Sequence, residues 1–97
     1  MYPKIDPRSL THNLYSISTL EYNMKSYKNN KIGFNRIGLR RLINTQILDL
    51  SFCMNFIFND DYIHSDDESY ITILSITNNQ PHIKYKELSK LVKSHNN

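Results

Sequence analysis

Residues 47–58 read ILDLSFCMNFIF and form the longest mainly apolar stretch of the chain. After Ser51, large apolar side chains occupy alternate positions, at Phe52, Met54, Phe56 and Phe58. A period of two places these side chains on one face of an extended chain. Residues 51–58 are therefore predicted to form a β-strand whose aromatic face is buried.

The segments on either side predict two helices and further strands. Before this strand, Asn35 is a good N-cap, and apolar residues follow it at helical spacing, at Leu39, Leu42, Ile43, Ile47 and Leu50. After it, Pro81 suits the first turn of a helix with an apolar stripe at Ile83, Tyr85, Leu88, Leu91 and Val92. The segments NLYSIS (13–18) and YITILSI (70–76), together with residues 22–34, are predicted to be strands.

These elements predict one small α+β domain over residues 1–97, in the order β-β-α-β-β-α. We expect about four strands in a mostly antiparallel sheet, with both helices on one face. Residues 1–12 are expected to form an extended arm, because Pro3 and Pro7 disfavour helix before them. Residues 59–69 are expected to form an acidic loop, with carboxylates at Asp60, Asp61, Asp66, Asp67 and Glu68.

The composition indicates an origin and argues against several kinds of chemistry. The chain has no alanine, although alanine is the best helix former, and an AT-rich genome of an organelle, parasite or virus explains this most simply. Cys53 is the sole cysteine, the four histidines are dispersed, and the acidic loop lacks the glycine of a calcium-binding loop. We therefore expect no enzymatic activity, cofactor, metal site or small-molecule substrate.

No segment predicts a membrane span or a targeting signal. The apolar runs fall short of the ~20 residues that a transmembrane helix needs. Residues 1–10 show neither a hydrophobic signal core nor an arginine-rich amphipathic pattern. If the protein acts in an organelle, we expect it to be encoded and made there.

A run of positive charge is the clearest candidate for a binding surface. Residues 21–41 carry six cations, and no carboxylate lies between Glu21 and Asp49. Lysines in this run are interleaved with tyrosines and a phenylalanine. Cations neutralise phosphates, and aromatic rings stack on unpaired bases, so RNA is the leading partner. An acidic protein neighbour or an ordinary solvated surface are the alternatives.

Several segments of the first sixty residues share a pattern with one protein family. YPKIDPRS (2–9) resembles a proline-containing entry to a hairpin, and LYSIS (14–18) and EYNMKSYKN (21–29) resemble the family's two hairpin strands. LDL at 48–50 resembles the start of a later strand. On these segments the chain resembles small-subunit ribosomal protein ten, of the organellar type of the uS-ten family. Residues 70–95 resemble that family's first strand and helix, displaced to the end by a circular permutation.

The resemblance implies a split β-α-β, ferredoxin-like sheet and a non-catalytic structural subunit of the mitochondrial small ribosomal subunit, on the matrix side. Ribosomal RNA and neighbouring ribosomal proteins would be its partners. The implied RNA-binding residues are Arg8, Lys25, Tyr27, Lys28, Lys31, Arg36, Arg40 and Arg41. The chain departs from the family at Tyr27, where the family has histidine, and after LDL, where the family has Pro-Ala-Gly.

A second interpretation fits the composition equally well. The chain would be an accessory subunit of a mitochondrial respiratory-chain complex, held by protein contacts without RNA. A viral or plasmid-encoded protein that binds a host factor is a third interpretation. RNA binding predicts a steep salt dependence, whereas a protein complex survives nuclease treatment.

Overall fold

The computed structural model describes residues 2–95, and every regular element in that range is helical. The elements are η1 (Pro7–Thr11), α1 (Ile17–Lys28), α2 (Leu39–Thr45), α3 (Leu50–Phe52), η2 (Cys53–Ile57), η3 (Asp60–Tyr62), α4 (Asp66–Ser69), α5 (Ile73–Asn79) and α6 (Tyr85–His95). η2 is a π-helical turn that continues α3, and η1 and η3 are 3-10 helices. The predicted α+β class is therefore wrong, because residues 2–95 contain no strand and so no four-stranded sheet.

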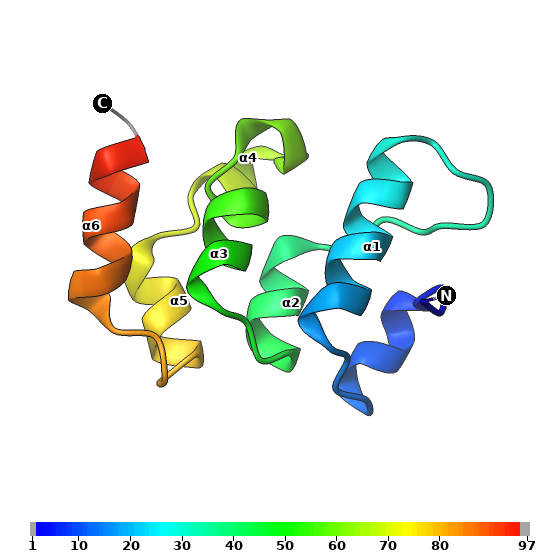
Figure 1. Cartoon of the computed structure of the whole chain (residues 1–97), viewed down its shortest axis with the longest axis horizontal. Helices are drawn as coiled ribbons and strands as arrows, with labels where there is room; N and C mark the ends of the chain where they lie inside the picture. Colours follow the sequence, from blue (N-terminus) through cyan, green and yellow to red (C-terminus); the bar gives the residue numbers. More distant parts are fainter. Residues whose placement is uncertain (1, 96–97) are drawn as a thin grey trace.

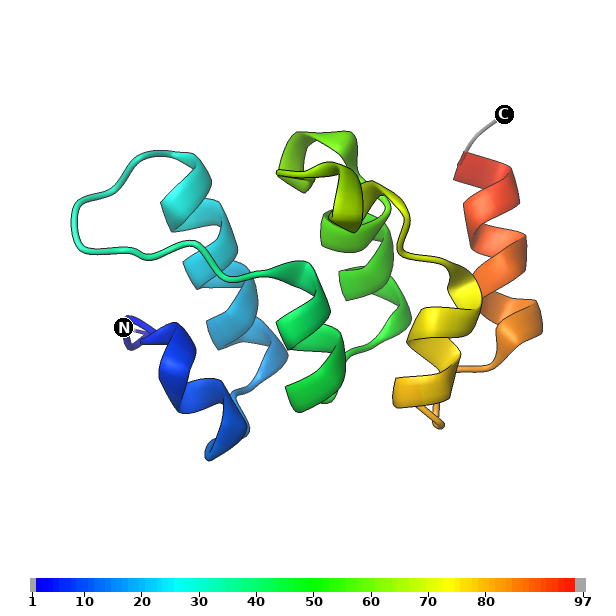
Figure 2. The ribbon, with the colours of Figure 1, turned by 180° about the vertical axis from the view of Figure 1, so that it is seen from behind.

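Three consecutive helix pairs, η1 with α1, α2 with α3–η2, and α5 with α6, lie side by side (Figures 1 and 2). Their first helices begin at residues 7, 39 and 73 and their second helices at 17, 50 and 85, a repeat of 32 to 35 residues. Helical repeat proteins are built in this way, because one pair cannot bury its apolar face alone. Residues 58–72, with η3 and α4, form the longer connection between the second and third pairs.

Two buried glutamines join each pair to the next in the same manner. The Gln46 amide donates to the carbonyls of Leu10 and Asn13, and its oxygen accepts from the Tyr15 backbone N–H. The Gln80 amide donates to the carbonyls of Ile43 and Gln46, and its oxygen accepts from the Leu48 N–H. Each glutamine ends the first helix of its own pair and hydrogen-bonds the turn of the preceding pair. The helix pairs are therefore true structural repeats.

Helices begin inside or just before three of the segments predicted as strands, and each of these helices starts at a capping side chain. Ser16 accepts from the Thr19 N–H, Asp49 from the Phe52 N–H, and Thr72 from the Ser75 N–H. Such caps satisfy backbone donors that a helix start leaves free. Residues 51–58 then bury a helical stripe, Phe52, Cys53, Phe56 and Ile57, in place of the predicted alternating face. Residues 22–34 likewise form most of α1 and a loop.

Both predicted helices exist, with shifted bounds. The first is confirmed only over α2, which starts after Gly38 instead of Asn35 and ends at Thr45. The second is confirmed as α6, which begins four residues beyond Pro81. Leu88 of its stripe is fully buried, whereas Tyr85 and Leu91 are exposed. The predicted arm contains η1, and the predicted acidic loop contains η3 and α4.

Candidate functional site

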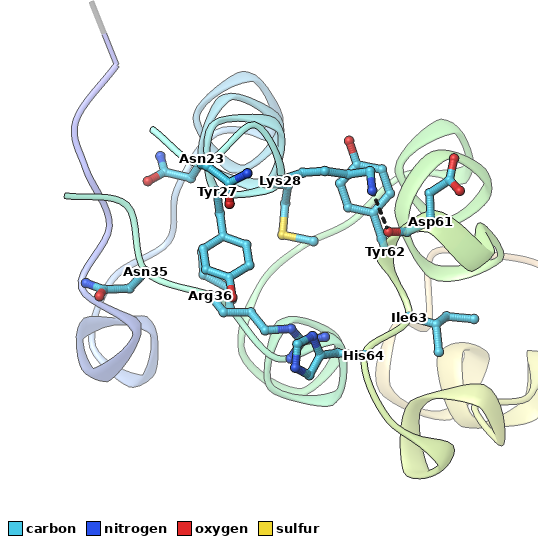
Figure 3. A pocket seen from close by; sticks show the side chains of 12 residues that line it. Asn23, Tyr27, Lys28, Asn35, Arg36, Asp61, Tyr62, Ile63 and His64 are labelled. Atoms are coloured by element: carbon cyan, nitrogen blue, oxygen red, sulfur yellow. Dashed lines mark hydrogen bonds between the residues drawn. The ribbon is translucent and has the colours of Figure 1, made fainter. Parts of the chain in front are cut away.

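A pocket of about 200 Å³ lies between α1, the loop before α2 and residues 61–64. Tyr27 and Lys28 reach it from the last turn of α1, Arg36 from the loop, and Tyr62 and His64 from the segment around η3 (Figure 3). Three residues of the predicted RNA-binding set therefore lie together here. Tyr62 and His64 come from the segment expected to be an acidic loop, and neither was among the predicted binding residues.

Lys28 closes one side of this pocket. Its ammonium donates to the Asp61 carbonyl oxygen at 3.0 Å, drawn as a dashed line in Figure 3. The same ammonium lies 5.5 Å from the centroid of the Tyr62 ring, within range of a cation–π attraction. Lys28 thus connects α1 to residues 61–62, and its charge is partly engaged inside the molecule.

Glu68 neutralises Arg36, the second cation that lines the pocket. This carboxylate is buried and forms an ion pair with Arg36. It also accepts from the backbone N–H groups of Leu39, at 3.0 Å, and His64, at 2.9 Å. Burial alone would raise the pKa of the Glu68 carboxyl, but the hydrogen bonds from Arg36 and these two N–H groups outweigh it and hold the pKa below its ordinary value. Gly38 offers α2 no side-chain cap, so Glu68 supplies it from 29 residues away.

The remaining predicted RNA-binding residues are dispersed. Arg8 pairs with Asp6 at 2.9 Å, and Arg40 with Asp67 at 2.8 Å. The guanidinium of Arg41 donates to the Pro7 carbonyl, and the Lys31 ammonium lies 5.3 Å from the Tyr22 ring centroid. Lys25 is exposed on α1. The structure thus spreads these charges over several elements, and their contact with RNA stays a prediction.

Two features of the described residues bear on metal and thiol chemistry. Within residues 2–95, no three His, Cys, Asp or Glu side chains gather closely enough to hold a metal ion. Cys53 is fully buried, and burial, with the nearby Asp49 charge, raises the pKa of its thiol to about 12. The thiol is therefore protonated at neutral pH, and only a thiolate is a good nucleophile.

A second candidate surface follows the turns within the three helix pairs. Leu14 and Ile47 are large apolar residues that are 68% and 61% exposed, and Pro81 is also exposed. Leu14 and Ile47 directly follow Asn13 and Gln46, whose carbonyls accept from the glutamine of the next pair, and Pro81 directly follows Gln80. All three turns lie at one edge of the molecule, at the bottom of Figure 1. We call Leu14, Ile47 and Pro81 the turn row.

Sequence reasoning missed the turn row, although a signal for it exists. The dipeptides Asn13-Leu14, Gln46-Ile47 and Gln80-Pro81 recur at intervals of 33 and 34 residues. Internal repeats of this length are the mark of helical arrays. Two positions in each repeat are too few to stand out before the helices are known.

No helix within residues 2–95 combines the length and the apolar character needed to cross a membrane. Comparisons of the chain with known protein families, curated proteins and solved structures find no significant match.

Proposed function

We propose that the chain is a non-catalytic docking subunit that binds a protein partner of a larger assembly along the turn row. The observation that carries this proposal is the exposure of Leu14 and Ile47 at equivalent places in consecutive turns. Exposed apolar groups gain free energy when a partner covers them. A rigid array that repeats such a group along one edge offers a partner several contacts at once.

The spacing of the row favours a helical partner. The first helices η1, α2 and α5 pack against one another in sequence. Packed helices lie about 8–10 Å apart, so neighbouring members of the row are separated by about 10 Å. Seven residues of an α-helix advance about 10.5 Å, and residues seven apart lie on one face. An amphipathic helix with an apolar residue at every seventh position therefore matches Leu14, Ile47 and Pro81 in turn.

The distribution of charge supports protein over RNA as the partner at this edge. Three of the cations that the sequence predicts to contact RNA are Arg8, Arg36 and Arg40. Each of them forms an ion pair with a carboxylate. A paired cation releases fewer counterions on meeting a phosphate and so contributes less to RNA affinity. The alanine-free composition supports an organellar assembly, such as a mitochondrial respiratory complex or ribosomal subunit, as the setting.

The double variant Leu14→Ser/Ile47→Ser tests the proposal. The tagged full chain would be isolated under native conditions from its own cells, with and without ribonuclease, and the co-purifying proteins quantified. We expect a nuclease-resistant complex that the double variant loses. Leu74→Ser is the matched control, because Leu74 is 58% exposed but lies on α5, away from the row.

The alternatives give different results. Loss of the complex on nuclease treatment, with ribosomal RNA in the untreated fraction, would favour the ribosomal interpretation and contradict docking through the row. Equal retention of partners by the double variant and Leu74→Ser would also contradict it.

A further inference from the structure

The positive charge of this protein is concentrated in one element. Residues 1–80 carry eight Lys and Arg and eight Asp and Glu, so their formal charges cancel. Residues 81–95 carry Lys84, Lys86, Lys90 and Lys93 against Glu87 alone. The whole formal net charge of +3 therefore lies on α6 and the turn before it. Such an asymmetry is the electrostatic mark of a surface that meets a polyanion.

Three of these lysines share one face of α6. Lys86, Lys90 and Lys93 stand four and three residues apart, a spacing that makes neighbours on a helix. With Tyr85, Ser89 and Ser94 they form a shallow, open stripe along the outer face of α6, which we call the lysine groove. The opposite face of α6 holds the buried Leu88 and packs into the molecule. The helix lies at the end of the row of helices, at the left of Figure 1.

These lysines differ from the cations around the pocket. Arg36 and Arg40 form ion pairs with carboxylates, and Lys28 donates to a backbone carbonyl. Within residues 2–95, no ion pair or hydrogen bond engages the ammonium groups of Lys86, Lys90 or Lys93. All three are exposed, and their charges are available to a partner.

We propose that the lysine groove binds the sugar–phosphate backbone of a single-stranded nucleic acid. Every residue type that lines it contacts phosphate: lysine by charge, and serine and tyrosine by hydroxyl hydrogen bonds. Tyr85 is 49% exposed beside the lysines, and an exposed aromatic ring can stack on an unpaired base. The single strand thus meets the protein at α6, away from residues 21–41.

Other polyanions fit the groove less well. Arginine, which forms two parallel hydrogen bonds to a carboxylate, is favoured where proteins recognise acidic side chains, and the groove contains none. A helix that binds anionic membrane surfaces inserts an apolar face, whereas the apolar stripe of α6 packs against the core at Leu88 and Val92.

The test measures binding of a fluorescent oligouridylate to the full chain by anisotropy. Neutralising three phosphates on a single strand predicts a log–log salt slope of about −2, or roughly 20-fold weaker binding at 200 mM than at 50 mM salt. The triple variant Lys86→Gln/Lys90→Gln/Lys93→Gln should weaken binding by at least about tenfold at 50 mM salt and flatten the slope. The charge-conserving Lys→Arg triple at the same positions should retain binding.

A second triple variant, Lys4→Gln/Lys25→Gln/Lys31→Gln, removes the same charge elsewhere and should bind nearly as well as the wild type. Far-UV circular dichroism confirms that each variant is folded. An equal loss of oligouridylate binding in the two Lys→Gln triple variants would overturn the proposal, and so would the absence of binding by the wild type at 50 mM salt. So would equally effective competition by polyglutamate, which would indicate an acidic protein partner. Because Leu14→Ser/Ile47→Ser leaves the groove intact, failure of docking through the turn row would not change this result.

Discussion

Replacement of Gln80 by leucine should destabilise the protein by about 3 kcal/mol. The Gln80 side chain is buried and joins three backbone groups, the Leu48 N–H and the carbonyls of Ile43 and Gln46. Leucine fills similar space but leaves all three without a partner. Each buried backbone group left unsatisfied costs about 1–3 kcal/mol. We take the lower end for each, because these groups lie beside an exposed turn that water can reach.

Urea unfolding, followed by far-UV circular dichroism, measures this loss. A domain of this size has a free energy of unfolding of about 5–15 kcal/mol, so a loss of about 3 kcal/mol moves the midpoint visibly. Asn78→Leu is the matched control, because Asn78 is exposed in the same helix and such changes usually stay within about 0.5 kcal/mol.

A carboxylate at this position sharpens the test. Gln80→Glu keeps an acceptor for the Leu48 N–H but, when ionised, has no donor for the two carbonyls. It should therefore be at least as destabilising as Gln80→Leu at neutral pH. A loss below about 1 kcal/mol for Gln80→Leu, or one equal to that of Asn78→Leu, would refute the idea that this amide holds the second and third pairs together.

Three further predictions follow from other buried or capping groups. Because the folded-state pKa of Glu68 is lowered, its contribution to stability is present above its ordinary pKa of about 4.3 and is lost as pH falls through the folded value. Glu68→Gln should reduce this acid dependence in urea titrations from neutral to acidic pH. The Cys53 thiol should react with a thiol reagent only at the rate of unfolding, and rapid labelling of the native protein would contradict its burial. Asp49→Ala should cost about 1 kcal/mol through loss of the cap to the Phe52 N–H, and Asp49→Asn should largely retain it.

The sequence allowed the α2 and α6 helices to be predicted, because their apolar spacing fits a helix and no other regular element. It failed at residues 51–58, where Phe52, Phe56 and Phe58 satisfy alternation and where Phe52 and Phe56 also stand one helical turn apart. The deciding residue was Asp49, an N-cap just before the run. Because the apolar spacing of the preceding segment continues to Leu50, Asp49 falls inside the predicted helix, and the sequence does not mark it as a helix start.

The candidate surfaces could be predicted only in part. Tyr27, Lys28 and Arg36 were singled out and do lie together in one pocket. The sequence could not show that the charges of Lys28 and Arg36 are engaged, because Asp61 and Glu68 lie about thirty residues away from them in the chain. The turn row could not be predicted for the same reason. Leu14 and Ile47 are far apart in the sequence and share an edge only because the helix pairs stack.

The shared role of Gln46 and Gln80 has a consequence for synthesis on the ribosome. The turn around Leu10 and Asn13 lacks its buried partner until residue 46 has emerged, and the turn around Ile43 and Gln46 waits for residue 80. A nascent chain emerges at about 5–20 residues per second, so the turns of the first and second pairs each spend a few seconds without that partner. A chain stalled before residue 80 therefore leaves the carbonyls of Ile43 and Gln46 and the Leu48 N–H without the amide that satisfies them in the native structure.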